Sequence, residues 1–315
     1  AVGVLLWIAL FLLRRKSPNS RYTVSCLALA ALAAAPLITA VSSYTPMADA
    51  RVVAESVSSA VVTDEIAAST PAVSSLASWY AWVEVWALPV WSLGVLLFAL
   101  RLAWSCGHAA ALRREGTPTE TWILSIVERA VTRVGVQQRI RVLMSSIAEV
   151  PSVVGWIRPV ILLPAATVAG LTPQQLEAVI AHELAHIRRH DYFVNLMQTV
   201  VETLLFYHPV VWWTSANIRR ERELCCDDLA VRSCGDAVCY ARALTKLEKL
   251  RVWKPGLAMN SAHGPLFERI QRVLTGEGGK GPSRVACAVG LLAGVLCLAF
   301  SLGWAQGGQD EGRFN

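Results

Sequence analysis

The sequence predicts a multi-span α-helical membrane protein that carries an α+β domain on its cytoplasmic side. Three observations lead to this fold class. Of the 315 residues, 54% are hydrophobic and the mean hydropathy is +0.45, both high for a soluble globular protein. The apolar residues gather in long, nearly uncharged runs. Between the last two runs lies a long polar stretch in which helix-like and strand-like patterns both occur.

Four apolar runs are candidate membrane spans, at about 1–13, 23–41, 78–104 and 285–304. The last three are long enough to cross a hydrocarbon core, which takes ~20 helical residues. The first run starts at Ala1 without a Met, and we interpret it as the tail of a further span. A cleaved signal peptide is the alternative for 1–13, but the basic cluster follows this run instead of preceding it.

Basic residues orient the runs. Four cations and no acid follow the first run, and three more lie at the end of the third run or after it: Arg14, Arg15, Lys16 and Arg21, then Arg101, Arg113 and Arg114. The positive-inside rule places both groups on the cytoplasmic side of a bacterial-type inner (cell) membrane. The predicted organisation is a transmembrane region over 1–104 with an outside loop at 42–77, a cytoplasmic domain over 105–284, a final span at 285–304 and an outside tail at 305–315.

The net charge of +6 does not predict a nucleic-acid partner. No helix-turn-helix or aromatic RNA-binding signature is present, and membrane topology with anionic lipid explains much of the excess. The eight cysteines fall in spans or on the reducing side, so we expect no disulfide framework. A transporter or channel subunit is disfavoured, because the spans are few and Glu84 is their only acid.

The polar stretch begins with an amphipathic pattern over 117–134, for which we predict a helix that starts at Thr117-Pro118. Segments 140–146 and 151–164 are rich in Val and Ile and predict strands. Pro151 and Pro159 favour an edge strand over a central one. The free edge of the 151–164 strand is therefore a candidate for binding an extended peptide.

The next helix carries the residues with the clearest chemistry. Thr172 as N-cap, Pro173 at the first position and Gln175 three residues after the cap form a helix-start signature. Within this helix, His182-Glu183-Leu184-Ala185-His186 matches H-E-x-x-H. Residues at i and i+4 share a face, so both imidazoles can bind one Zn²⁺ ion. Glu183 is then placed to accept a proton from the water that the metal activates.

A catalytic zinc ion needs a third protein ligand and one open position. The candidates downstream are Glu202, His208, Glu221, Glu223, Asp227, Asp228 and His263. We favour Glu223, on a second predicted helix at about 217–231, because Asp227 follows it by one turn. Asp227 could then accept the free N–H of a ligating histidine, while Glu221 points to another face of the helix. His190 could rival His186 as a ligand, but it breaks the i, i+4 spacing.

The apolar segment 193–213 lies between the two metal-binding helices. A single crossing would put Glu223 and His182 on opposite sides of the membrane, and two crossings would need ~40 residues. We therefore predict a helical hairpin that turns near His208-Pro209. Whether it dips into the bilayer or lies at its surface stays open, although Gln198 and Glu202 favour the surface or a protein-covered groove.

At these residues the chain resembles the BlaR/MecR-type membrane metallopeptidases, the zinc-protease part of beta-lactam-sensing signal transducers. The segments that carry the resemblance are HELAHIRRHD (182–191), FYHPVVWW (206–213) and RRERELCCDDLAV (219–231). The chain is more distantly similar to the HtpX and CAAX-prenyl membrane proteases, which share H-E-x-x-H followed by E-x-x-x-D. The resemblance implies a zincin-type (gluzincin) metallopeptidase domain with His182, His186 and Glu223 as ligands of one catalytic Zn²⁺, Glu183 as general base and Asp227 behind a ligand.

The resemblance also implies partners and a further residue. The segment 261–270 resembles the S-x-H-P…E-R-I segment of the HtpX group, which makes His263 a candidate catalytic residue that steadies the oxyanion, although Gly264 replaces the usual proline. Such proteins cleave themselves or a cytoplasmic repressor after an outside signal. We therefore expect a membrane zinc metalloendopeptidase with a peptide or protein substrate, embedded in the lipid bilayer and without direct nucleic-acid contact. Beta-lactam sensing has no support in the few residues after the last run.

A function of another class stays open, namely a catalytically silent transmembrane signal transducer with a structural zinc site. Cys225 and Cys226 could close such a site, since structural zinc is usually held by four Cys or His ligands. A Glu directly after the first ligand has no purpose there, which favours the enzyme. The sequence does not determine the substrate, the cleavage site, the inducing signal or whether the chain forms a homodimer.

Overall fold

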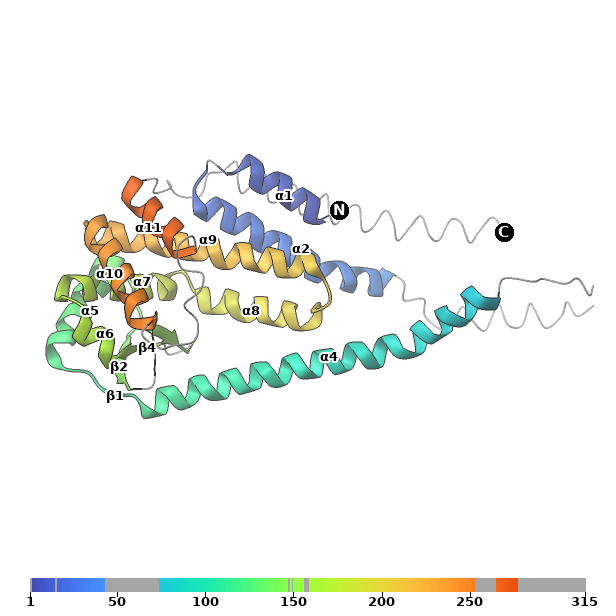
Figure 1. Ribbon diagram of the computed structural model, residues 1–315, viewed down its shortest axis with the longest axis horizontal. Helices are drawn as coiled ribbons and strands as arrows, with labels where there is room; N and C mark the ends of the chain where they lie inside the picture. Colours follow the sequence, from blue (N-terminus) through green and yellow to red (C-terminus); the bar gives the residue numbers. More distant parts are fainter. Residues whose placement is uncertain are drawn as a thin grey trace, which may run out of the picture.

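The computed structural model describes residues 2–14, 16–42, 74–146, 148, 150–155, 159–252 and 265–276 (Figure 1). Its helices near the N-terminus are α1 (Val2–Leu12), α2 (Pro18–Ser42) and α4 (Ser74–Glu115). Within the described part of the chain, two helices are long and apolar enough to cross a membrane, over Pro18–Thr39 and Val85–Glu115, whereas α1 is shorter. They overlap the predicted spans at 23–41 and 78–104. The predicted span at 285–304 lies outside the described residues.

Helix α4 does not end at the predicted boundary between residues 104 and 105. It continues to Glu115 as one helix, and its far end reaches the sheet, where it contacts β2 and β3. In Figure 1 it runs beneath the other helices for most of its length. The predicted membrane region and the predicted soluble domain are therefore joined by a continuous helix, without a linker at that point.

The sheet has the strand order β1-β2-β4-β3, formed by Thr117–Pro118, Arg141–Ser145, Val160–Pro164 and Ser152–Val154. Strands β2 and β4 are parallel, with Leu143 opposite Leu162, and the two outer strands run antiparallel to their neighbours. Strand β4 is fully buried, and β3 forms an edge.

Three details of the predicted strands and helices were wrong. The segment 151–164 forms two strands instead of one, β3 and β4, which pair antiparallel. Thr117 and Pro118 form an edge strand against β2, and α5 begins at Thr121 and ends at Val134. The strand after Pro159, β4, is central and not an edge strand. Pro159 does not prevent this, because it precedes the first paired residue and removes no hydrogen bond from the ladder. The edge preference holds for β3, which follows Pro151.

Helices surround this sheet and form the main hydrophobic core. The core joins α5 and β4 to α7 (Pro173–Arg188), α10 (Ala237–Val252) and α11 (Pro265–Thr275), with α6 (Ala165–Gly170) beside β4. Helix α7 lies at the centre, and Leu176, Ile180 and Leu184 are completely buried on it. Since this helix carries the H-E-x-x-H residues, the core holds the candidate site in place.

A helical hairpin follows α7, as predicted. Helix α8 (Asp191–Leu204) leads into a turn at 205–208, and α9 (Pro209–Cys234) returns against it. The helix expected at about 217–231 is thus the second half of α9, which is continuous from the turn. Helix α2 packs along α9, so that α1, α2, α8 and α9 extend away from the sheet as one group (Figure 1).

Candidate metal centre

Helix α7 holds the first two candidate ligands on a well-anchored scaffold. The Thr172 side chain accepts a hydrogen bond from the backbone N–H of Gln175, and the Gln175 side chain accepts one from the backbone N–H of Thr172. This reciprocal cap confirms the predicted start of the helix and satisfies two of its free donors. The helix is buried on several sides, so His182 and His186 project from a segment whose position is determined by the core.

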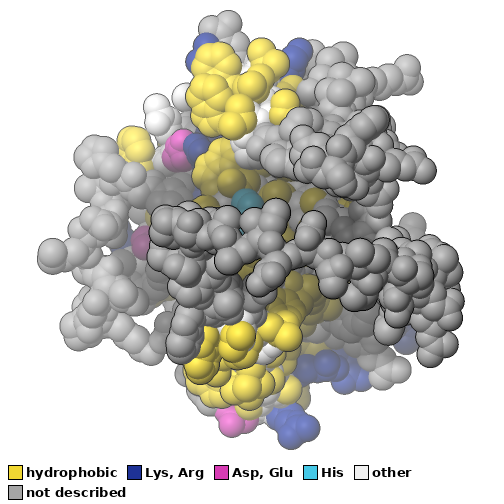
Figure 2. Space-filling view, turned by 90° about the vertical axis from the view of Figure 1, so that its right-hand side faces the viewer, with side chains coloured by type: hydrophobic (Ala, Val, Ile, Leu, Met, Phe, Trp, Pro, Cys, Tyr) yellow, Lys and Arg dark blue, Asp and Glu magenta, His cyan; other side chains and the backbone are white. Residues whose placement is uncertain are grey.

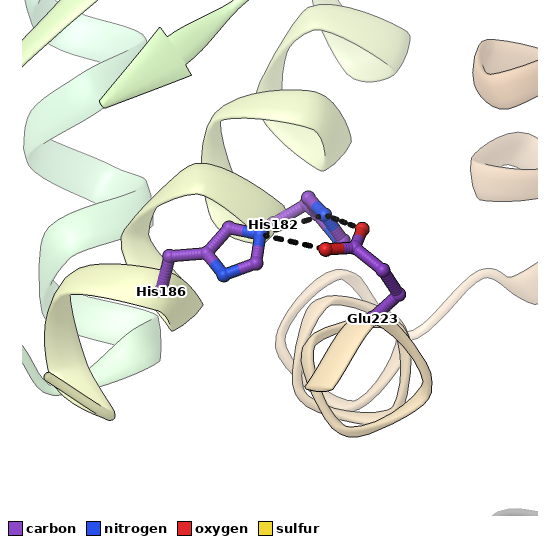
Figure 3. Close-up of side chains that lie close together, drawn as sticks. All are labelled: His182, His186 and Glu223. Atoms are coloured by element: carbon purple, nitrogen blue, oxygen red, sulfur yellow. Dashed lines mark hydrogen bonds and ion pairs between the residues drawn. The ribbon is translucent and has the colours of Figure 1, made fainter. Parts of the chain in front are cut away.

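Three side chains converge from α7 and α9 (Figure 3). The Nε2 atoms of His182 and His186 are 3.2 Å apart. The carboxylate of Glu223 lies 3.6 Å from Nε2 of His182 and 3.9 Å from Nε2 of His186. These donor atoms all lie within 4.8 Å of one another, which is compatible with one metal ion.

The spacing of these atoms can be compared with a zinc site. With metal–nitrogen bonds of roughly 2.0–2.1 Å, ligand atoms of a tetrahedral ion lie about 3.3–3.4 Å apart. The two imidazole nitrogens match this distance, and the carboxylate needs only a small side-chain movement to reach it. Two histidines and one carboxylate also leave one coordination position open, as in catalytic zinc sites. The residues therefore fit the ion that the sequence motif implies.

A second set of contacts orients both rings. Nδ1 of His182 lies 2.8 Å from the Tyr240 hydroxyl and 3.3 Å from the Asp227 carboxylate. Nδ1 of His186 lies 2.9 Å from the carboxylate of Asp191. With each Nδ1 directed at a hydrogen-bonding group, each Nε2 is turned toward Glu223, and such partners stabilise the tautomer that binds metal.

Sequence reasoning missed three of the residues that complete this arrangement. Asp191 follows His186 by five residues, and its acidic character close to the motif was the available signal. Tyr240 of α10 donates its hydroxyl hydrogen to Asp227 at 2.6 Å, and Arg269 of α11 binds the same carboxylate. No spacing relates these last two residues to the motif, because they reach the site only through the packing of α10 and α11.

The electrostatics favour a positive charge between the two rings. Burial lowers the pKa of His182, but hydrogen bonds to Asp227 and Glu223 outweigh it and raise this pKa to about 9. Burial acts to raise the pKa of Glu223, yet the hydrogen bond and charge of His182, with the charge of His186, lower it to about 2. The site thus provides an ionised carboxylate beside imidazoles that are already paired with acids, an environment that attracts a proton or a metal cation.

Glu183 shares a cleft with these groups. The cleft has a volume of about 540 Å³ and is lined by His182, Glu183, His186 and Glu223, together with Ser152 and Val153 of β3. Burial raises the pKa of the Glu183 carboxyl above its usual range, and the positive charges of the two histidines oppose this rise. A carboxyl group in such surroundings can exchange a proton more readily than an exposed one.

A second group of metal-binding atoms consists of His186, Asp191 and Cys226. The Cys226 thiol lies 3.3 Å from Nδ1 of His186 and 3.3 Å from Asp191, on the side of the ring that faces away from Glu223. Burial raises the pKa of this thiol well above its ordinary value, so it does not become a thiolate easily. Cys225 packs instead in the cluster that α9 forms with α2. Neither cysteine belongs to the group of donor atoms that His182, His186 and Glu223 form.

Of the other candidate ligands, His190 lines the cleft, and His208 is the N-cap of α9 at the turn of the hairpin. Three acidic candidates are paired with arginines. Glu221 forms an ion pair of 2.8 Å with Arg21 of α2, on another face of α9. Glu202 is paired with Arg219, and Asp228 with Arg272. His263 lies outside the described residues.

Comparison with known proteins gives one family. The model of the family described as BlaR1 peptidase M56 matches residues 1–273. The regulatory protein BlaR1 of Bacillus licheniformis is 22% identical over 186 residues, which cover 58% of this chain and 31% of that protein. The methicillin resistance mecR1 protein of Staphylococcus aureus strain Mu50 is 26% identical over 91 residues, or 29% of this chain and 16% of that protein. The chain thus spans less than a third of the length of these relatives.

Proposed function

The chain belongs to the BlaR1 peptidase M56 family, and from this premise we propose that it is a membrane-embedded zinc metalloendopeptidase. The observation that carries the proposal is the convergence of His182, His186 and Glu223 beside Glu183 in one cleft. In this reading the soluble part is a zincin-type α+β domain on the cytoplasmic side of a multi-pass cell-membrane protein. The parallel and antiparallel strands beside α7 are compatible with it.

His182 and His186 would hold the metal ion through their Nε2 atoms, and Glu223 through its carboxylate. Bound zinc supplies Lewis-acid chemistry, in which it polarises a carbonyl group and lowers the pKa of a water molecule. Asp191 and Asp227 keep the two imidazoles in the orientation that this requires, with Tyr240 between His182 and Asp227. The protein therefore contributes both the ligands and the groups that position them.

Glu183 is the general base, and then the general acid, of this mechanism. Its carboxylate takes a proton from the attacking water, holds it, and passes it to the nitrogen of the leaving amine. The raised pKa that burial causes suits this role, since a carboxyl that binds its proton more tightly is a better base. Removing this carboxylate while keeping its shape should stop the reaction without removing the metal ligands.

The free edge of β3 supports binding of an extended peptide. One edge of β3 is paired with β4, with Val153 opposite Ile161. Ser152 and Val153 line the cleft that contains Glu183. A substrate strand added beside β3 would use backbone hydrogen bonds for affinity and would pass the two histidines.

The relatives suggest the setting of the reaction. They are named as a regulatory protein and a methicillin-resistance protein. We propose that this chain cleaves itself or a cytoplasmic regulator, such as a repressor, during transmembrane signalling. The alternative, a silent transducer with a structural zinc clip, has less support, because the buried thiol of Cys226 lies on the far side of the His186 ring from Glu223.

The proposal is tested with detergent-purified protein by comparing the wild type with Glu183→Gln. Self-cleavage and cleavage of a casein-type substrate are measured, together with bound zinc. Glu177→Gln is the matched control, because Glu177 lies on the same helix but is paired with Arg133 away from the cleft. We expect about one zinc ion in all three proteins, and cleavage by wild type and Glu177→Gln only.

Two results would contradict the proposal. Zinc in all proteins with no cleavage by any of them, even after reconstitution into lipid, would favour the silent transducer. Cleavage by Glu183→Gln at the wild-type rate would exclude Glu183 as the general base.

A further inference from the structure

The helical hairpin, here residues 191–218, presents an apolar stripe to the outside. Phe193, Met197, Val200 and Leu204 recur at the spacing of one helix face and are each 39–48% exposed. We propose that this hairpin is a re-entrant membrane element, with the acyl chains of lipids covering the stripe. The proposal rests on the membrane topology put forward above.

The polar side chains of the hairpin do not share that stripe. The Gln198 side chain is buried and donates a hydrogen bond of 3.2 Å to the carbonyl oxygen of Ser215. Glu202 forms an ion pair of 2.6 Å with Arg219. Between these two charged residues, 203–218 contain no Asp, Glu, Lys or Arg. The Gln198 amide nitrogen and the Glu202 carboxylate therefore have partners on α9, whereas Oε1 of Gln198 is buried without a partner among the described residues. An ion pair lowers the cost of placing Glu202 near a membrane.

Four carbonyl groups at the turn of the hairpin accept hydrogen bonds from the protein itself. A helix end leaves carbonyl groups without partners, and in hydrocarbon each such group costs several kcal/mol. The indole N–H of Trp91 donates to the carbonyl of Leu204 at 3.0 Å, and that of Trp212 donates to the carbonyl of Phe206 at 2.7 Å. Backbone N–H groups of the same turn bind the carbonyls of Leu205 and His208.

The contacts between α2 and α9 allow the depth of the turn in the bilayer to be estimated. Arg21, near the basic start of α2, is paired with Glu221 of α9. From Glu221 back to Val211, α9 rises by ten residues, which is ~15 Å at 1.5 Å per residue. Val211 is buried in the same cluster as Leu29 and Leu32 of α2. Since the hydrocarbon core is ~30 Å thick, the turn reaches about its middle and does not cross it.

Helix α4 places the turn at the same apolar level. The Phe206 ring stacks on Phe98 with a centroid distance of 5.6 Å and lies so close to Gly94 that a Cβ there would be 2.2 Å from the ring. Gly94 and Phe98, like Trp91, belong to the uncharged part of the candidate span that precedes Arg101. Figure 2 faces the end of the molecule that lies on the right in Figure 1. Hydrophobic side chains dominate the described surface in this view, with charged ones near its edges.

This placement has a consequence for the substrate. Glu223 follows Glu221 by two residues, so the metal centre lies close to the level of Arg21, where α2 enters the membrane. Tyr192 and Phe193, at the start of the hairpin, line the same cleft as the candidate ligands. The cleft therefore opens at the membrane surface, and the peptide bond it accepts belongs to a segment that lies on or next to a membrane.

The test uses the full chain in vesicles of phosphatidylcholine and phosphatidylglycerol. A photoreactive benzoylphenylalanine replaces Val200 or Leu204, and the adducts are identified by mass spectrometry. Leu96 of α4 is the positive control, because it is 54% exposed within the candidate span. Trp122 of α5 is the negative control, because it is 41% exposed on the sheet domain. We expect acyl-chain adducts at Val200, Leu204 and Leu96, and none at Trp122.

Each other outcome has a defined meaning. Lipid adducts at Leu96 without lipid adducts at Val200 and Leu204 would overturn the proposal, as would crosslinks from the stripe to another part of this chain or to a second copy. If Leu96 also gives no lipid adduct, the membrane topology fails and the hairpin proposal fails with it. Cleavage of casein by the same samples tests the peptidase function separately. An active protein without lipid adducts at Val200 and Leu204 would contradict the insertion of the hairpin but not the peptidase function.

Discussion

Arg269 of α11 donates two hydrogen bonds to the carboxylate of Asp227 on α9, at 2.8 and 2.6 Å. A third nitrogen of the same guanidinium group lies 3.4 Å from the Glu223 carboxylate. One side chain thus joins the candidate third ligand to the acid behind His182. Burial acts to raise the pKa of Asp227, but the hydrogen bonds and the positive charge of Arg269 help to hold this pKa below its usual range. Helix α11 is therefore part of the candidate site, although it contributes no ligand.

Replacing Arg269 should weaken metal binding more than folding. Arg269→Ala removes both guanidinium contacts of Asp227 and leaves it the Tyr240 hydroxyl and Nδ1 of His182. Groups that orient a ligand typically contribute 10–100-fold to metal affinity. Zinc affinity is measured by competition with a chelator. Arg272→Ala is the matched control, because Arg272 makes the same double contact with Asp228 one residue further on. Equal losses of zinc affinity in both variants would show that α11 acts only through stability.

Removing the Tyr240 hydroxyl tests the same network from α10. Tyr240→Phe keeps the buried ring and removes the group between His182 and Asp227. We expect zinc affinity to fall about tenfold and the free energy of unfolding to fall by about 1 kcal/mol. Chelator competition and chemical denaturation measure the two quantities. An unchanged zinc affinity would mean that Asp227 alone orients His182.

Glu223 and Glu221 lie on one helix and allow a direct comparison. Glu223→Gln should reduce zinc affinity strongly, because a neutral amide replaces the only carboxylate at the convergence of the two Nε2 atoms among the described residues. Glu221→Gln should retain zinc, because its partner is Arg21 on α2. Zinc content after dialysis distinguishes them. Loss of zinc in Glu221→Gln with retention in Glu223→Gln would reverse the assignment of the third ligand.

Zinc affinity should rise with pH up to about 9. Burial disfavours the charged form of His182, but Asp227 and Glu223 outweigh it, so its pKa is about 9 in the metal-free protein. Below this pH the metal must displace a proton from the imidazole, and above it no such competition remains. An ordinary histidine would stop competing near pH 6.5. Titrations with chelator-buffered zinc measure the profile, and Asp227→Asn should move its plateau to lower pH. A wild-type affinity that is already constant above pH 7 would contradict the role of the carboxylates.

Several features of the protein were determined by the sequence alone, because they depend on residues close together in the chain. The capping box at Thr172 and Gln175 and the i, i+4 spacing of His182 and His186 are properties of a single helix. The hairpin followed from a length argument, since too few residues separate the two halves of the site for two crossings. The family resemblance also rested on contiguous segments, and the family match confirms it.

Only the tertiary structure decided which distant residues meet these motifs. Tyr240 and Arg269 lie 58 and 87 residues beyond His182, and no local periodicity predicts that α10 and α11 pack so as to place both of them on Asp227. The order of the strands and the continuity of α9 depend in the same way on the burial of apolar surface across the whole core. Local hydrogen bonds and spacing define an element, whereas packing between elements decides which of its side chains meet in space.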